Sequence, residues 1–225
     1  MRKLIITGAS GMVGEEVLQE SLKQDSVSSV VVIGRRHCGI LHPKLKEVIH
    51  SDFFNLDTID ADLKGYDACL FCLGVSSVGM KEAEFFKMTH TLTLKFAKFL
   101  YQQNPEMLFC YISGAGTDTS EKGRQMWARV KGKTENDLQQ IGFKGVYLFR
   151  PGYLQPSPNM QHTLKYYRYL KWMYPFLNAV VPGYVSSLQQ LAKAMLYVSL
   201  DGYRQRILEV KEIRAAATMF DGMKK

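Results

Sequence analysis

A glycine-rich turn between an apolar segment and a helical segment dominates the first twenty residues of the chain. Residues 3–7 have the composition of a strand, Gly8–Gly14 follows with G-x-x-G-x-x-G spacing, and residues 15–20 have the composition of a helix. In this context the glycines predict a dinucleotide-binding turn, because they permit a tight turn and let backbone approach a pyrophosphate. The free N–H groups of the new helix would face the phosphates. The alternative is an ordinary connection with incidental glycines.

Strand-like and helix-like segments alternate over about the first 150 residues. Val30–Ile33 is β-branched or aliphatic throughout, as in a strand buried on both faces. This alternation predicts an α/β fold with a doubly wound parallel sheet. Further strands are expected at 45–50, 68–73, 108–112 and 145–150, and helices at 81–103 and 124–141.

The alternation ends after residue 152, although we expect a single domain over residues 1–225. Residues 153–205 are expected to contribute a small C-terminal helical cap on the substrate side. Within them, 161–181 is rich in tyrosine, lysine and arginine, and a helix is expected from Ser186 or Ser187 to Leu200. A last strand over 206–211 and a short terminal helix complete the prediction.

The end of the second predicted strand indicates which dinucleotide is bound. An NAD-binding fold usually places an acidic residue there to hold the ribose 2′-hydroxyl. This chain has Arg35 and Arg36 instead. Because a guanidinium offers paired donors to a phosphate, the position favours NADP over NAD. Taken alone, the two arginines could equally be an exposed loop pair.

Two further strand ends complete the predicted cofactor contacts. Asp52 and Phe53 follow the third strand, where they could contact an adenine, although Asp52 could equally cap a turn. Leu73 and Gly74 end the fourth strand, where a glycine lets a ribose approach the backbone. The full predicted set is Gly8, Ser10, Gly11, Met12, Val13, Gly14, Arg35, Arg36, Asp52, Phe53, Leu73, Gly74, Lys131, Pro151, Gly152 and Tyr153.

Composition excludes several classes of protein. Hydrophobic residues make up 46% of the 225 positions and charged residues 22%, which argues against disorder. The net charge of +8 is dispersed along the chain, so we expect cofactor phosphates rather than nucleic acid to account for part of it. Residues 172–192 lack charge, but prolines, a glycine and polar residues interrupt them, so no membrane span is expected.

Cysteine and histidine positions predict neither a metal site nor a disulfide. Cys69 and Cys72 form a C-x-x-C, but residues three apart on a strand point to opposite faces. The five histidines lack ligand spacing. The apolar stretch after Arg2 is too short for a secretory signal, so we expect a cytoplasmic, reduced protein.

The ordered motifs resemble an atypical short-chain dehydrogenase/reductase, over roughly residues 1–212. The resemblance rests on Thr7–Gly14, Gly34–Arg36, Ser113, Lys131 and Arg150–Gly152. It is nearest to the small NAD(P)-binding Rossmann group that includes Tat-interacting-protein-like oxidoreductases and nucleoside-diphosphate-sugar epimerases. The resemblance implies a catalytic Ser, Tyr and Lys, with the last two spaced Y-x-x-x-K. The tyrosine is the acid/base, the lysine binds the nicotinamide ribose, and the serine polarises the substrate oxygen.

Carried over by position, Ser113 and Lys131 match this triad, whereas Trp127 occupies the place of the tyrosine. An indole has one N–H donor and no proton to exchange near neutral pH, so Trp127 cannot act as the acid or base. Tyr111 and Tyr153 lie near strand ends and are candidate substitutes. A core role for Trp127 is the alternative. Tyr167 and Lys171 share the Y-x-x-x-K spacing, but they lie in the cap segment rather than on the helix after Ser113.

Two classes of function follow from this departure. The first is an NADP(H)-dependent reductase or epimerase acting on a small carbonyl or sugar-nucleotide substrate. The second is a protein that binds NADP(H) without turnover, as a regulatory or partner-binding module. The sequence identifies neither the substrate nor a protein partner, and it leaves the oligomeric state open.

Overall fold

A parallel sheet of seven strands forms the centre of the molecule, in a computed structural model that describes residues 1–157 and 182–223. The strand order is β3-β2-β1-β4-β5-β6-β9, and every neighbouring pair is parallel. The order reverses direction between β1 and β4, so the carboxyl edge there forms the crevice in which such sheets bind ligands. The predicted doubly wound α/β fold is confirmed. The strands are β1 Arg2–Thr7, β2 Val27–Gly34, β3 Leu45–Ile49, β4 Ala68–Phe71, β5 Leu108–Ile112, β6 Gly145–Phe149 and β9 Ile207–Leu208.

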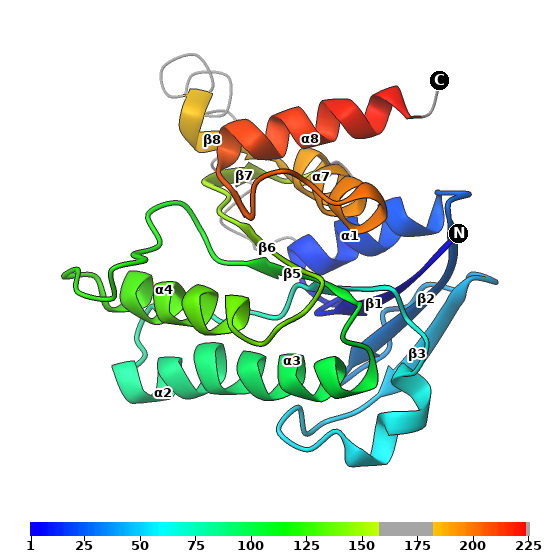
Figure 1. Cartoon of the computed structure of the whole chain (residues 1–225), viewed down its shortest axis with the longest axis horizontal. Coiled ribbons are helices and arrows are strands. Elements are labelled where there is room, and N and C mark those ends of the chain that lie inside the picture. Colours follow the sequence, from blue (N-terminus) through cyan, green and yellow to red (C-terminus); the bar gives the residue numbers. More distant parts are fainter. Residues whose placement is uncertain (158–181, 224–225) are drawn as a thin grey trace.

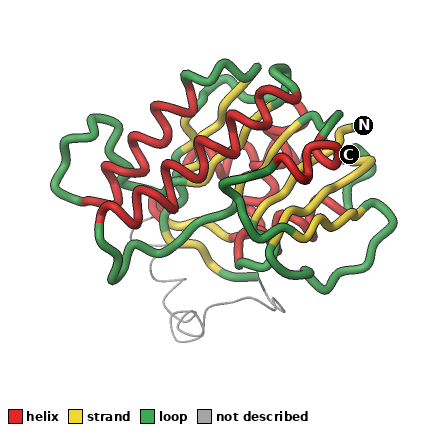
Figure 2. The backbone as a smooth tube through the Cα atoms, turned by 90° about the horizontal axis from the view of Figure 1, so that it is seen from below, coloured by secondary structure: helices red, strands yellow, loops and turns green. Residues whose placement is uncertain are grey.

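Helices cover both faces of the sheet (Figure 1). On one face lie α1 (Met12–Leu22), α7 (Leu188–Asp201) and α8 (Val210–Gly222). The other face carries α2 (Glu82–Phe86), α3 (Leu92–Gln103) and α4 (Met126–Gln139), with the short helix η1 (Asp57–Leu63) beside them. Figure 2, seen from below, shows helices of this second face lying over the strands. Alternate strand residues enter each core, so Leu4 faces the α1 side and Ile5 the α3 side.

The long helix predicted over 81–103 is continuous but irregular. Residues Lys87–Thr91 form a π-helical turn, η2, between α2 and α3. Apolar residues at helical spacing form its inner face, where Phe85, Leu92 and Phe96 are buried. Met88 and Phe99 are only partly buried.

The C-terminal region differs from its prediction in one respect. Instead of a strand over 206–211, β9 has two residues and α8 begins at Val210, because Glu209 in extended conformation starts the helix. The predicted start of α7 is confirmed: Ser187 caps it, and its hydroxyl and the Gln190 side chain form a reciprocal capping box. A small second sheet pairs β7 (Tyr153–Gln155) with β8 (Val185–Ser187), beside the short helix η4 (Pro182–Tyr184). Of the cap predicted over residues 153–205, residues 158–181 lie outside the described residues, and α7 packs against α1, β4 and β5.

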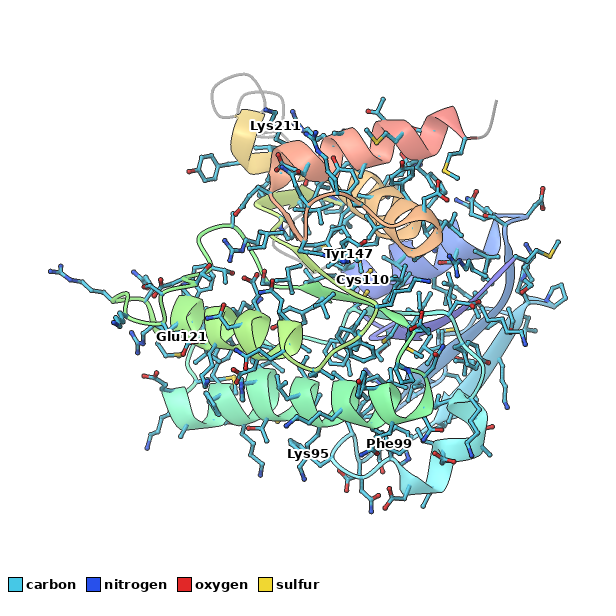
Figure 3. All side chains as sticks on the ribbon, in the orientation of Figure 1. Lys95, Phe99, Cys110, Glu121, Tyr147 and Lys211 are labelled. Carbon is cyan, nitrogen blue, oxygen red and sulfur yellow. The ribbon has the colours of Figure 1, made fainter. Side chains whose placement is uncertain are left out.

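The C-x-x-C cysteines are separated by the sheet, as predicted. Cys69 packs in the core on the α3 side, whereas Cys72 packs against the core on the α1 side. Cys110 lies in the interior (Figure 3), and burial raises the pKa of all three thiols. No disulfide or metal site links them. Within residues 1–157 and 182–223, no helix combines the length and apolar character that crossing a bilayer requires.

Candidate functional site

The glycine turn leaves no room for side chains between β1 and α1. Gly8 has a φ of +70°, and a Cβ there would lie 2.7 Å from the carbonyl oxygen of Cys72. A Cβ on Gly14 would lie 2.1 Å from the carbonyl oxygen of Gly8. The first turn of α1 has no side-chain cap, so its N–H groups are directed at the crevice. Backbone packed this closely, with an uncapped helix start, fits a pyrophosphate.

A pocket of about 230 Å³ opens beside this turn, at the carboxyl ends of β2, β3 and β4. Five residues that the sequence analysis placed in the cofactor site line it together: Arg35, Asp52, Phe53, Leu73 and Gly74. The lining residues that the sequence analysis missed are Ser51, Phe54, Val75, Met88 and Leu92. The pocket therefore offers apolar and aromatic walls with one cation at its rim, as a nucleoside requires.

Asp52 caps a turn and also lines the pocket, while its contact with an adenine stays a prediction. Its Oδ1 accepts a hydrogen bond from the backbone N–H of Phe54 at 2.9 Å, which closes a turn, while the residue also lines the pocket. Phe53 is buried and stacks on Phe96, with ring centroids 6.1 Å apart. Thr7 holds the backbone after β4, because its hydroxyl accepts hydrogen bonds from the backbone N–H groups of Cys72 and Leu73.

Arg35 and Arg36 are exposed at the end of β2. Among the described residues, neither guanidinium has a hydrogen-bonded or ion-paired partner, although Arg35 lines the pocket. Two unpaired guanidinium groups next to a nucleoside-sized pocket can receive a phosphate.

The second half of the site surrounds the end of β5, where Ser113 follows the last strand residue. Its side chain is turned inward: the hydroxyl donates to Oε1 of Glu135 at 2.5 Å and lies 3.2 Å from the carbonyl oxygen of Phe149. Ser113 is 5% exposed. The serine is where the sequence predicted it, but its hydroxyl proton is already committed to a carboxylate.

Arg150 holds that carboxylate from the other side. Its guanidinium bonds both oxygens of Glu135, one of them at 3.0 Å, and also reaches Thr119 and Glu209. Glu135 is fully buried, so the ion pair lies in the interior. This network joins β5, α4, β6 and the start of α8.

Lys131 lies one turn before Glu135 on α4, and its Nζ donates a hydrogen bond to the backbone carbonyl of Ser113. Burial lowers the pKa of Lys131 to about 8, while the charge of Glu135 opposes this shift. Among the described residues no carboxylate forms an ion pair with Lys131, because Arg150 and Ser113 occupy the Glu135 oxygens. The lysine is therefore a cation without a counter-ion at the ligand-binding edge.

Trp127 is one turn before Lys131 and lies over the loop that follows Ser113. A Cβ on Gly116 would lie 3.6 Å from the indole, and one on Gly114 would lie 3.9 Å from it. The tryptophan thus occupies the position that the resemblance assigns to tyrosine, and its partly buried ring packs on backbone. The loop itself is fixed to the end of β6, where the Ala115 N–H donates to the carbonyl of Pro151.

The two tyrosines considered as substitutes lie in different places. Tyr111 is buried in the core on the α3 side, with its ring 6.2 Å from Phe71, so it does not reach the open edge. Tyr153 is half-buried in β7, and burial raises the pKa of its phenol. Gly152, predicted as a cofactor contact, packs so tightly that a Cβ would lie 2.1 Å from the carbonyl oxygen of Tyr184.

Glu135 is the main site residue that the sequence analysis missed. The available signal was its spacing: Lys131 and Glu135 are four residues apart and therefore share a helix face. The described residues contain no group of three or more metal-binding side chains. The described histidines instead serve local structure: His50 bonds the backbone oxygens of Asp52 and Asn55, and His90 pairs with Asp137.

Comparisons with known proteins agree with this arrangement. The model of the NAD dependent epimerase/dehydratase family matches residues 4–122. The chain is similar to Protein HTATIP2 of Rattus norvegicus, at 27% identity over 99% of this chain and 92% of that protein. It is also similar to the mitochondrial Protein FMP52 of Meyerozyma guilliermondii, at 23% identity over 92% of this chain and 90% of that protein.

Solved structures share the fold at lower identity. The Bordetella bronchiseptica enzyme WbmH in complex with NAD+ superposes with a TM-score of 0.66 at 17% identity, covering 100% of this chain and 82% of that one. MoeE5 in complex with UDP-glucose and NAD gives a TM-score of 0.65 at 14% identity, covering 98% of this chain and 82% of that one.

Proposed function

Because the chain belongs to the NAD dependent epimerase/dehydratase family, we propose that it is an NADP(H)-dependent reductase or epimerase acting on a small carbonyl or sugar-nucleotide substrate. One observation carries the proposal. The glycine turn, the uncapped α1 start and the pocket bearing Arg35 are contiguous at one sheet edge. Gly8 and Gly14 would admit the pyrophosphate, the pocket would hold the adenosine, and Lys131 would lie on the nicotinamide side. The cofactor, when bound, supplies or accepts hydride.

The preference for NADP over NAD rests on Arg35 and Arg36. Bound NAD+ or NAD is named for the similar structures WbmH and MoeE5, so the fold itself serves NAD. In this chain the end of β2 offers two guanidinium groups that pair with no other described residue, and they would attract the 2′-phosphate that distinguishes NADP. The sugar-nucleotide option draws on the UDP-glucose named for MoeE5.

Replacing Arg35 and Arg36 by serine tests this preference. We expect NADPH affinity to fall about 100-fold, as two charge-assisted contacts of roughly 1.5 kcal/mol each are lost, while NADH affinity changes less than threefold. Isothermal titration of both cofactors measures the difference. Arg204→Ser removes an exposed arginine just before β9 and should change neither affinity. Wild-type protein that binds NADH more tightly than NADPH would refute the preference, and protein that binds neither would refute the proposal.

A second candidate function, NADP(H) binding without turnover, is favoured by Trp127 and by the inward-turned Ser113 hydroxyl. Trp127→Tyr would place a phenol one turn before Lys131. If wild-type protein binds NADPH but leaves carbonyl probes unreduced, and Trp127→Tyr reduces them at least tenfold above buffer, the binding-module function is supported. Turnover by the wild-type protein would exclude it. The matched control is Trp127→Phe, which has no hydroxyl.

A further inference from the structure

Lys131 is a buried ammonium group whose expected counter-ion is taken by other residues. Glu135 lies one helical turn away, but its oxygens are bonded to Ser113 and Arg150. One N–H of the Lys131 ammonium therefore donates a hydrogen bond to the Ser113 carbonyl, and its other N–H groups have no partner among the described residues. The Ser113 carbonyl follows β5, so the Lys131 ammonium that contacts it lies at the edge of the sheet where ligands bind.

Among the described residues, the groups around Lys131 offer few other sources of a proton. Trp127, the neighbour one turn away, has no exchangeable proton near neutral pH. The Ser113 hydroxyl donates to Glu135, and the hydroxyl of Tyr111 lies in the core beside Thr134. Tyr153 is the competing candidate, and burial raises the pKa of its phenol. Within the described part of the chain, the other charged groups of this cluster are Glu135 and Glu209, which both pair with Arg150.

We infer that Lys131 is the proton donor for carbonyl reduction in this site. It takes the role of the tyrosine that Trp127 replaces. This inference rests on the proposed reductase function. In the step, the carbonyl carbon gains the hydride that NADPH supplies, and its oxygen gains a proton as an N–H bond of the Lys131 ammonium breaks. The products are an alcohol, NADP+ and a neutral Lys131 amine, which recovers its proton from water.

The protonation behaviour of Lys131 suits this role. Burial lowers its pKa to about 8, so the ammonium predominates at pH 7 yet releases its proton readily. A general acid must be protonated to act, so the rate should be constant below about pH 8 and fall tenfold per pH unit above it. An arginine at this position would keep the charge but could not release a proton.

The first readout requires no turnover. In ¹³C-lysine NMR spectra of the free protein, one lysine Cε signal, absent from Lys131→Met, should titrate near pH 8, while exposed Lys95 and Lys98 provide internal references. A Lys131 signal that titrates above pH 10 would overturn the inference. Circular dichroism verifies that each variant is folded.

The second readout follows NADPH absorbance at 340 nm after mixing the loaded protein with 4-nitrobenzaldehyde or phenanthrenequinone. We expect wild-type oxidation with the stated pH profile and about 100-fold slower, pH-independent oxidation in Lys131→Arg, with both rates measured at saturating NADPH so that a change in cofactor affinity does not enter the comparison. Equal rates in wild type and Lys131→Arg would overturn the inference alone. A wild type that binds NADPH but oxidises none of it would overturn the inference together with the reductase function, and would support the binding module. Failure of NADPH to bind would instead overturn the proposed function.

Discussion

Gly14→Ala is expected to lower the free energy of unfolding by about 3 kcal/mol and to weaken NADPH binding more than tenfold. The added Cβ would lie 2.1 Å from the Gly8 carbonyl oxygen and 2.5 Å from its carbon, so backbone must move. Overpacking of this kind costs roughly 1–3 kcal/mol, and a backbone obstacle has little freedom to relax. The shift separates α1 from β1, which opens the phosphate-binding turn. Urea denaturation and NADPH titration measure the two effects.

Gly222→Ala is the matched control for this substitution. Gly222 ends α8, and a Cβ there would have no atom within 4 Å, so stability should stay the same or rise slightly. If Gly14→Ala retained both wild-type stability and wild-type affinity, close contact between α1 and β1 would not be required for either.

Arg150→Leu is expected to lower the free energy of unfolding by roughly 3–5 kcal/mol. The substitution leaves the fully buried Glu135 carboxyl group without its cation, and breaking a buried pair on one side typically costs this much. Since domains of this size are stable by about 5–15 kcal/mol, the variant should be close to unfolding at 37 °C. Urea denaturation at pH 7 gives the value.

Two control variants test whether the loss of stability arises because the charge pair is buried. The double variant Glu135→Leu/Arg150→Leu removes both charges and should be more stable than Arg150→Leu alone. Lys46→Leu breaks the exposed pair with Asp62 and should change the free energy of unfolding far less than Arg150→Leu does. A loss below 1 kcal/mol in Arg150→Leu would contradict the assignment of Arg150 as the neutralising partner of Glu135.

Local sequence patterns predicted the sheet and brought five of the proposed cofactor contacts to one pocket, because both follow from short-range rules. A β-branched run gives a buried strand, and the residue after each parallel strand reaches the same edge, so Arg35, Asp52 and Gly74 meet although they are distant in the chain. The pattern could not show the direction of the Ser113 hydroxyl. That direction depends on Glu135 and Arg150, and no helix or strand period encodes which side chains pair across elements.

The last strand was predicted too long for a related reason. Ile207, Leu208 and Val210 favour a strand over 206–211, but Glu209 is extended and starts α8. The packing of α8 on α7 outweighs the local strand preference there.

The strand order has a consequence for synthesis of the protein. A nascent chain that ends at residue 157 contains six of the seven strands of this sheet and the helices α2, α3 and α4 of the α3 side. Its other face carries α1 but lacks α7 and α8, which supply the rest of that layer among the described residues. The apolar residues of β4 and β5 that pack against α7 gain this cover only when the last forty residues have been synthesised. The half of the chain that carries the glycine turn is thus synthesised first, but the helices that complete its covering layer are synthesised last. A C-terminal truncation would therefore expose the centre of the sheet rather than its edge.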